Sequence, residues 1–177
     1  GYVVFAGLVS GMGTTVFAAH SIAVTAETIF YVPGYGLRSA ASTLIGNARG
    51  EGNKKKLKTV GILSVLLTVA VMCVSGLVLF FGAHLLMSLF TPSRPVVDLG
   101  AEMLRLVALS EPFFGLMVVL EGIFYGLGRT RYSFIVETVG MWCIRILFTF
   151  LCVRYWGLGL KAVWYCMIAD NVCKAIL

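Results

Sequence analysis

The chain has 177 residues, of which 59% are hydrophobic and only 12% are charged, with a formal net charge of +6. A soluble domain carries about 25% charged residues, so this composition excludes an ordinary soluble protein and indicates an integral membrane protein. The basic residues fall between apolar runs rather than on one polar surface, which argues against a nucleic-acid partner and leaves membrane lipid as the expected surroundings.

The apolar runs are near the roughly 20 residues that a helix needs to cross a bilayer. In chain order they predict six helices, over about 1–17, 19–48, 57–81, 96–127, 130–155 and 159–177. The segment 83–95 is too short to span, and we expect an interfacial turn of helix closed by Pro92 and Pro95. The predicted fold class is therefore all-α integral membrane, a bundle of six transmembrane helices. Both chain ends fall inside apolar runs, so we expect a fragment of a longer protein.

Basic residues in short loops set the orientation of such a bundle. With six alternating helices, eight of them share one side: Arg49, Lys54, Lys55, Lys56, Lys58, Arg129, Arg131 and Lys174. Only Arg94, Arg154 and Lys161 mark the other side. We expect a multi-pass protein of the plasma membrane with both chain ends in the cytoplasm. The lysine run is interpreted as a topology signal in preference to a lipid or partner site.

Charged residues within the predicted spans are the main functional candidates, because each costs about 2.5–3.5 kcal/mol at the centre of a membrane helix. They are Glu27, Arg38, Glu111, Glu121, Glu137 and Arg145. Glu27 lies near the midplane with no cation within one helical turn, so it suits a proton carrier. The sequence names no partner for Arg38.

The other charges receive more structural interpretations. Glu111 and Arg145 lie at equal depth on neighbouring antiparallel helices and are predicted to form an ion pair. Glu121 is expected to be hydrated at the cytoplasmic end, and Glu137 fits a structural and a functional role equally. His20 is expected at the interface, and Tyr155, Trp156 and Trp164 in an aromatic belt.

Pro33 and Gly34 interrupt the second helix near the midplane. A bend for packing and a hinge or broken-helix site are equally compatible with them. The five cysteines are interpreted as small buried hydrophobes. No catalytic motif and no metal-ligand spacing occurs, so we expect no enzyme, no cofactor and no metal site beyond Na⁺ near Glu27.

Two stretches together carry a family resemblance. AAHSIAVTAETIFYVPGYGLRSAASTLIGNARGEGNKKK (18–56) resembles the second-helix signature of the multidrug and toxic compound extrusion (MATE) family, and VVLEGIFYGLGRTRYSF (118–134) resembles its fourth-helix end and following loop. The six-helix layout is similar to one MATE lobe over the whole chain. The resemblance implies one half of a twelve-helix, pseudo-symmetric transporter, more like its C-terminal half, whose companion lobe is missing.

The resemblance also implies secondary export of small organic, often cationic, compounds in exchange for Na⁺ or H⁺. C-terminal lobes of the family use acids on their first, second and fourth helices for coupling. Glu27 matches the second-helix position, the first helix has no carboxylate, and Glu111 lies one turn before the fourth-helix position near Phe114. Glu27, Glu111 and Glu137 are thus the candidates for cation coupling or substrate binding.

Two alternatives stay open. A lipid-linked sugar flippase of the same superfamily would need a cationic cavity that Arg38 and Arg145 both line. A non-transporting membrane scaffold would have all of its intramembrane charges paired and no central cavity.

Overall fold

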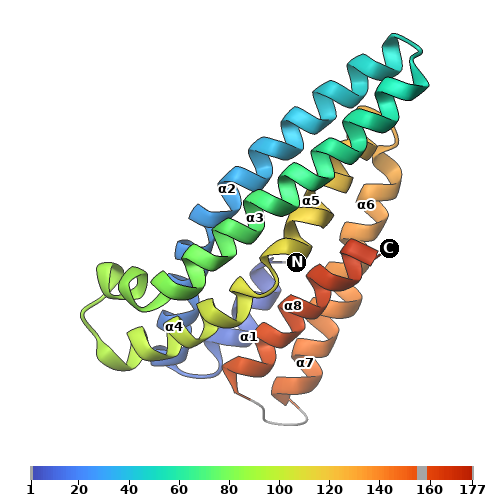
Figure 1. The fold of residues 1–177 in the computed structure, drawn as a ribbon. Coiled ribbons are helices and arrows are strands. Elements are labelled where there is room, and N and C mark those ends of the chain that lie inside the picture. The colour runs from blue at the N-terminus through green and yellow to red at the C-terminus, as the bar shows by residue number, and fades with distance from the viewer. Residues whose placement is uncertain (1, 155–158, 177) are drawn as a thin grey trace.

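The structure is a computed structural model that describes residues 2–154 and 159–176. Within these residues every regular element is a helix (Figure 1), in the order α1 (Tyr2–Ser10), α2 (Thr14–Gly50), α3 (Lys54–Phe90), α4 (Arg94–Ala108), α5 (Glu111–Gly126), α6 (Thr130–Val139), the π-helix η1 (Gly140–Ile146), α7 (Leu147–Arg154) and α8 (Leu160–Ile176). The predicted all-α membrane bundle is confirmed.

Three helical stretches in the described part are long and apolar enough to cross a membrane: Thr14–Gly50, Lys54–Phe90 and Thr130–Cys152. The bent pair of α4 and α5 makes a fourth if it counts as one span. The helix α8 has 17 residues and α1 has nine, which is less than the length required of a span by itself.

The two longest helices, α2 and α3, form an antiparallel hairpin along one side of the bundle (Figure 1). Each has 37 residues, or about 55 Å, against a hydrocarbon core of roughly 30 Å. Their turn is built by Gly52, whose φ of 68° suits glycine, and by Asn53, whose side chain accepts a hydrogen bond from the Lys56 amide at 3.0 Å. These residues place the basic turn at the end of the bundle.

Two predicted helix boundaries are wrong, one before the hairpin and one at its end. The first helix ends at Ser10 rather than residue 17, because the chain turns at Gly13, which has a φ of 114°. The segment 83–90 is not a separate interfacial turn but the last part of α3, which continues to Phe90 and ends before Pro92.

The predicted helix over 96–127 is two helices with a bend of 56° between them. Pro112 lies in the first turn of α5 and has no amide hydrogen to donate to the carbonyl of Ala108, so the helical hydrogen bonding is interrupted where the chain bends. Pro33, by contrast, lies inside α2, which stays helical from Thr14 to Gly50. The expected interruption at Pro33 is therefore not a break in this structure.

The predicted helix over 130–155 is continuous in its described part, but its middle third is the π-helix η1. Tyr155 and Trp156, predicted for the aromatic belt, lie outside the described residues. Trp164 is fully buried rather than at a belt, with its ring 5.7 Å from that of His20. His20 is itself buried within the bundle, and its expected place at the membrane interface stays a prediction.

The packing around the cavity relies on close helix approaches. The α2 helix packs against α3 and α5, while α8 packs against η1, α5 and α4. Glycines of α5 make the α2–α5 contact possible: a Cβ on Gly122 would lie 2.5 Å from the Arg38 carbonyl oxygen, and one on Gly126 at 2.5 Å from that of Ser42. This tight contact fixes the relative positions of the two helices that carry Glu27 and Glu121.

Candidate functional site

A cavity of about 400 Å³ lies between α2, α5, α6, η1 and α8. Its charged lining residues are Glu27, Arg38, Glu121, Glu137, Arg145 and Lys174, and its aromatic ones are Tyr31, Tyr35 and Phe114. Two of the three predicted coupling candidates, Glu27 and Glu137, therefore line one cavity. The third, Glu111, is not among the residues that line it.

Glu27 is held on the cavity wall by α2 and is 2% exposed. The hydroxyl of Tyr31, one turn further along α2, donates a hydrogen bond to its carboxylate. The Tyr31 ring stacks on Phe114 of α5 with 3.9 Å between ring centroids. Among the described residues no lysine or arginine nitrogen lies within ion-pair distance of Glu27, although Arg145 acts on it electrostatically from further away.

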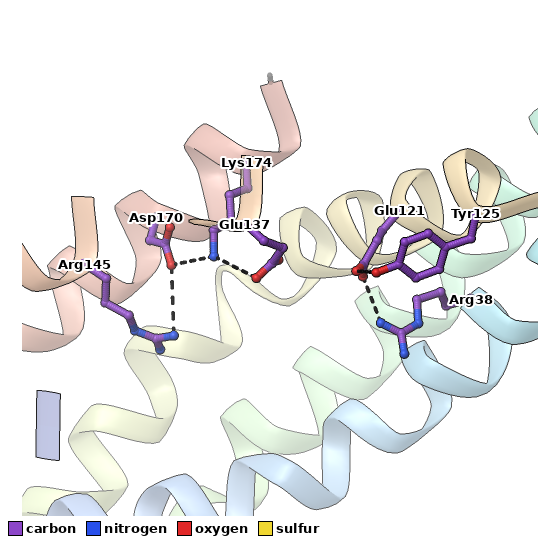
Figure 2. A network of polar contacts seen from close by, with 7 residues as sticks. All are labelled: Arg38, Glu121, Tyr125, Glu137, Arg145, Asp170 and Lys174. Atoms are coloured by element: carbon purple, nitrogen blue, oxygen red, sulfur yellow. Dashed lines mark hydrogen bonds and ion pairs between the residues drawn. The ribbon is translucent and has the colours of Figure 1, made fainter. Parts of the chain in front are cut away.

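Arg38 has a partner that the sequence does not reveal. Its guanidinium lies 2.9 Å from the carboxylate of Glu121, and that carboxylate also accepts a hydrogen bond from the hydroxyl of Tyr125 (Figure 2). Arg38 also lies over the ring of Tyr35, 5.0 Å from its centroid. Glu121 is mostly buried but lines the central cavity, and its expected hydration at the cytoplasmic end stays a prediction.

A second charge cluster joins α6, η1 and α8 (Figure 2). The Lys174 ammonium lies 3.0 Å from Asp170 and 3.5 Å from Glu137, and the Arg145 guanidinium lies 4.0 Å from Asp170. The backbone at Gly140 is pressed against the side chains of Lys174 and Asp170, where a Cβ would clash with both. Lys174, predicted as a topology charge at the far end of the last helix, is therefore a buried ion-pair residue.

The predicted ion pair between Glu111 and Arg145 is not formed as a hydrogen-bonded pair. Arg145 faces Asp170 instead, and neither carboxylate oxygen of Glu111 has a hydrogen-bond partner in the described part of the chain. Glu111 is 0% exposed and lies at the start of α5, against Gly76 of α3, where a Cβ would lie 3.1 Å from that of Glu111. The Glu111 carboxyl group is therefore buried without a cation beside it in the described chain, and the like charge of Glu27 acts on it only from a distance.

The predicted hinge glycine and the five cysteines have ordinary packing neighbours. Gly34 allows α2 to approach its neighbours, since a Cβ there would lie 3.3 Å from the Met72 sulfur and 3.4 Å from the Phe114 ring. All five cysteines are free, and the Sγ atoms of Cys152 and Cys166 lie 3.9 Å apart. No group of three or more metal-ligand side chains occurs in the part that the structure describes.

Comparisons with known proteins agree with the resemblance in the motifs. The family model MatE matches residues 1–151. A probable multidrug resistance protein NorM from Thermotoga maritima is 28% identical over 181 aligned residues, which cover 100% of this chain and 38% of the relative.

The fold is similar to two solved structures of a multidrug resistance MATE family transporter of the MOP superfamily. The inward-facing form has a TM-score of 0.88 over 98% of this chain, and the outward-facing form 0.90 over 99%, each with 21% identity and 40% of the transporter covered. The chain thus spans about two fifths of the length of the proteins it matches. Because the family model covers most of its residues, the chain belongs to the MATE family of membrane transporters.

Proposed function

We propose that this chain is the C-terminal six-helix lobe of a secondary active antiporter that exports organic cations across the plasma membrane in exchange for Na⁺ or H⁺. The observation that carries the proposal is Glu27, a buried carboxylate on a cavity wall whose hydrogen-bond partner in the described residues is a tyrosine hydroxyl rather than a cation. Membrane-embedded acids are costly, and they mark ion and substrate pathways.

The electrostatics of the cavity support a cationic occupant. Arg38 is neutralised by Glu121, while Lys174 and Arg145 are balanced by Asp170 and Glu137 together. The fixed positive charges therefore leave Glu27 available to a mobile cation. Tyr31, Tyr35 and Phe114 also line the cavity, and although Tyr31 and Phe114 stack on each other and Arg38 covers one face of Tyr35, an outer ring face can attract an organic cation by about 0.5–2 kcal/mol.

The same contacts weaken the two alternatives. Arg38 and Arg145 do line the cavity, as a flippase would need, but each lies beside a carboxylate and so presents no strongly cationic surface. A scaffold would have its charges paired and no central cavity, whereas the cavity is present and Glu27 and Glu111 lack ion pairs in the described chain. Both observations favour transport.

Alternating access is proposed to occur by movement of this lobe against its companion. The fold matches inward-facing and outward-facing transporters almost equally, which supports motion of the lobe largely as one body. Pro33 cannot donate a backbone hydrogen bond within α2, so the helix has a weak point there that can bend during the cycle. The α2–α3 and α5–α6 turns carry seven basic residues toward one end of the bundle, which supports a cytoplasmic placement of that end (Figure 1).

The test measures substrate efflux by the full-length protein in vesicles under an imposed Na⁺ or proton gradient. The variant Glu27→Gln is expected to lose gradient-driven efflux, because glutamine keeps the shape but cannot exchange a cation. The control Glu102→Gln removes an exposed carboxylate paired with Lys161 and should leave efflux unchanged. Unimpaired coupled efflux in Glu27→Gln would remove this residue from the mechanism.

Glu111 and Glu137 remain secondary candidates for coupling. Glu111 is the stronger candidate of the two, because both of its carboxylate oxygens are buried and neither has a hydrogen-bond partner in the described chain. Glu137 is partly exposed to the cavity and lies beside Lys174, so its charge is largely compensated. The variants Glu111→Gln and Glu137→Gln in the same efflux assay rank the two.

A further inference from the structure

A separate apolar groove of about 370 Å³ opens on the outside of the α2–α3 hairpin, near its turn. Its walls come from α2, α3 and α5, and they include Ile45, Gly61, Ile62, Leu66 and Ile123. It shares no lining residue with the central cavity. Ile62 and Leu66 are exposed, so the groove faces outward rather than into the bundle.

Lys58 is the one polar side chain among the lining residues of this groove. It is exposed, and it has no ion pair with the carboxylates that the structure describes. Lys54 and Lys55 precede it on the same helix, and the nearby acid Glu51 is occupied by Lys56 at 2.7 Å. The mouth of the groove is therefore positively charged, and no ion pair with a described carboxylate neutralises Lys58.

Along its length the groove has a charged end followed by an apolar stretch, which is the order of headgroup and acyl chain in a phospholipid. Lys58 lies four residues into α3, or about 6 Å from its start, and Leu66 lies about 12 Å further along the helix. A lysine at this level places its ammonium among the headgroups while its stem follows the apolar surface. Gly61 keeps the groove open below it, since the nearest side-chain atom to a Cβ there would be Ile45 Cδ1 at 3.8 Å.

We propose that this groove binds one anionic glycerophospholipid of the leaflet at the α2–α3 turn. The phosphate contacts Lys58, and one acyl chain lies against Gly61, Leu66 and Ile123. Charge complementarity selects the lipid, because basic side chains next to a membrane attract anionic headgroups. This site goes beyond the proposed transport and depends on neither the exported compound nor the coupling ion.

The experiment places a reporter in the groove of the full-length protein. The variant Leu66→Trp is reconstituted in vesicles that contain, at equal mole fraction, either brominated phosphatidylglycerol or brominated phosphatidylcholine. The tryptophan fluorescence that this variant adds to that of the parent protein is expected to be quenched more strongly by the brominated anionic lipid. The control Leu85→Trp, on an exposed position near the other end of α3, should show no such preference.

Two further variants separate the charge from the groove. Lys58→Gln in the Leu66→Trp protein should weaken the preference for phosphatidylglycerol about fivefold, the effect of one lysine near an anionic surface. Gly61→Leu keeps every charge and should also lower quenching by filling the groove, whereas the matched Gly82→Leu should not. Equal quenching by both lipids, or no quenching because the companion lobe covers the groove, would overturn the proposal.

Discussion

The substitution Asp170→Asn offers a sharp test of the charge cluster between α6, η1 and α8. Asp170 is 0% exposed, and its carboxylate lies 3.0 Å from the ammonium of Lys174, whose side chain is 5% exposed. Asparagine has nearly the same shape but no charge. The substitution therefore leaves a buried lysine with one acid, Glu137 at 3.5 Å, in place of two.

The expected cost follows from burial. Removal of one partner from a buried ion pair destabilises a protein by about 3–5 kcal/mol, because the remaining charge stays out of water. Glu137 is partly exposed and still compensates Lys174, so the low end of that range applies. A loss of about 3 kcal/mol changes the ratio of folded to unfolded protein by roughly a hundredfold.

The assay is detergent-induced unfolding of the full-length protein followed by circular dichroism. Glu102→Gln provides the control, because its pair with Lys161 is exposed on both sides and such pairs contribute about 0–1 kcal/mol. The double variant Asp170→Asn with Lys174→Gln should cost less than the sum of the single variants. If Asp170→Asn destabilises no more than Glu102→Gln does, the cluster is not a buried structural element and the reasoning fails.

Two further substitutions test the α2–α5 contact and the site beside it. Gly122→Ala should destabilise the protein by about 1–3 kcal/mol in the same unfolding assay, because the new Cβ would lie 2.5 Å from the Arg38 carbonyl oxygen. The control Gly36→Ala has open space around it and should be near neutral. Equal effects of the two substitutions would contradict the tight contact. Tyr31→Phe keeps the ring stack but removes the hydrogen bond to Glu27. It should change the coupling-ion concentration for half-maximal efflux about tenfold, and an unchanged ion dependence would count against a role for this pair.

The sequence predicts the membrane class and the family because both depend on composition and local motifs. It also predicts the burial of Glu27, since a carboxylate in the middle of an apolar helix has few other places to be. Pro112 was equally visible, and its missing amide hydrogen explains the break between α4 and α5, so that boundary could have been found from the sequence. The continuity of α2 through Pro33 could not, because the neighbouring helices decide whether a proline bends or breaks a span.

The sequence does not identify the ion-pair partners of the charged residues in the helices. Arg38 and Glu121 are 83 residues apart, and no local pattern links them. Arg145 was assigned to Glu111 by depth alone, but depth does not fix which face of a helix a side chain occupies, and the structure brings Asp170 to it instead. Lys174 resembles a topology signal near the end of a helix until α6 and η1 are packed against it.

The arrangement of ion pairs restricts how a cation at Glu27 can act on the lobe. Lys174 ties α8 to α6, and Asp170 faces η1 through Arg145, so the far wall of the cavity is held by fixed charges. On the near wall, Arg38 ties α2 to α5, while Glu27 lies about 16 Å away along α2 and is linked to α5 through the stack of Tyr31 on Phe114. The stacked rings carry no charge to separate, whereas parting Arg38 from the mostly buried Glu121 would leave that carboxylate without its cation. A change of charge at Glu27 should therefore shift α2 against α5 around the Arg38 anchor, on the side of the cavity where Pro33 weakens the helix.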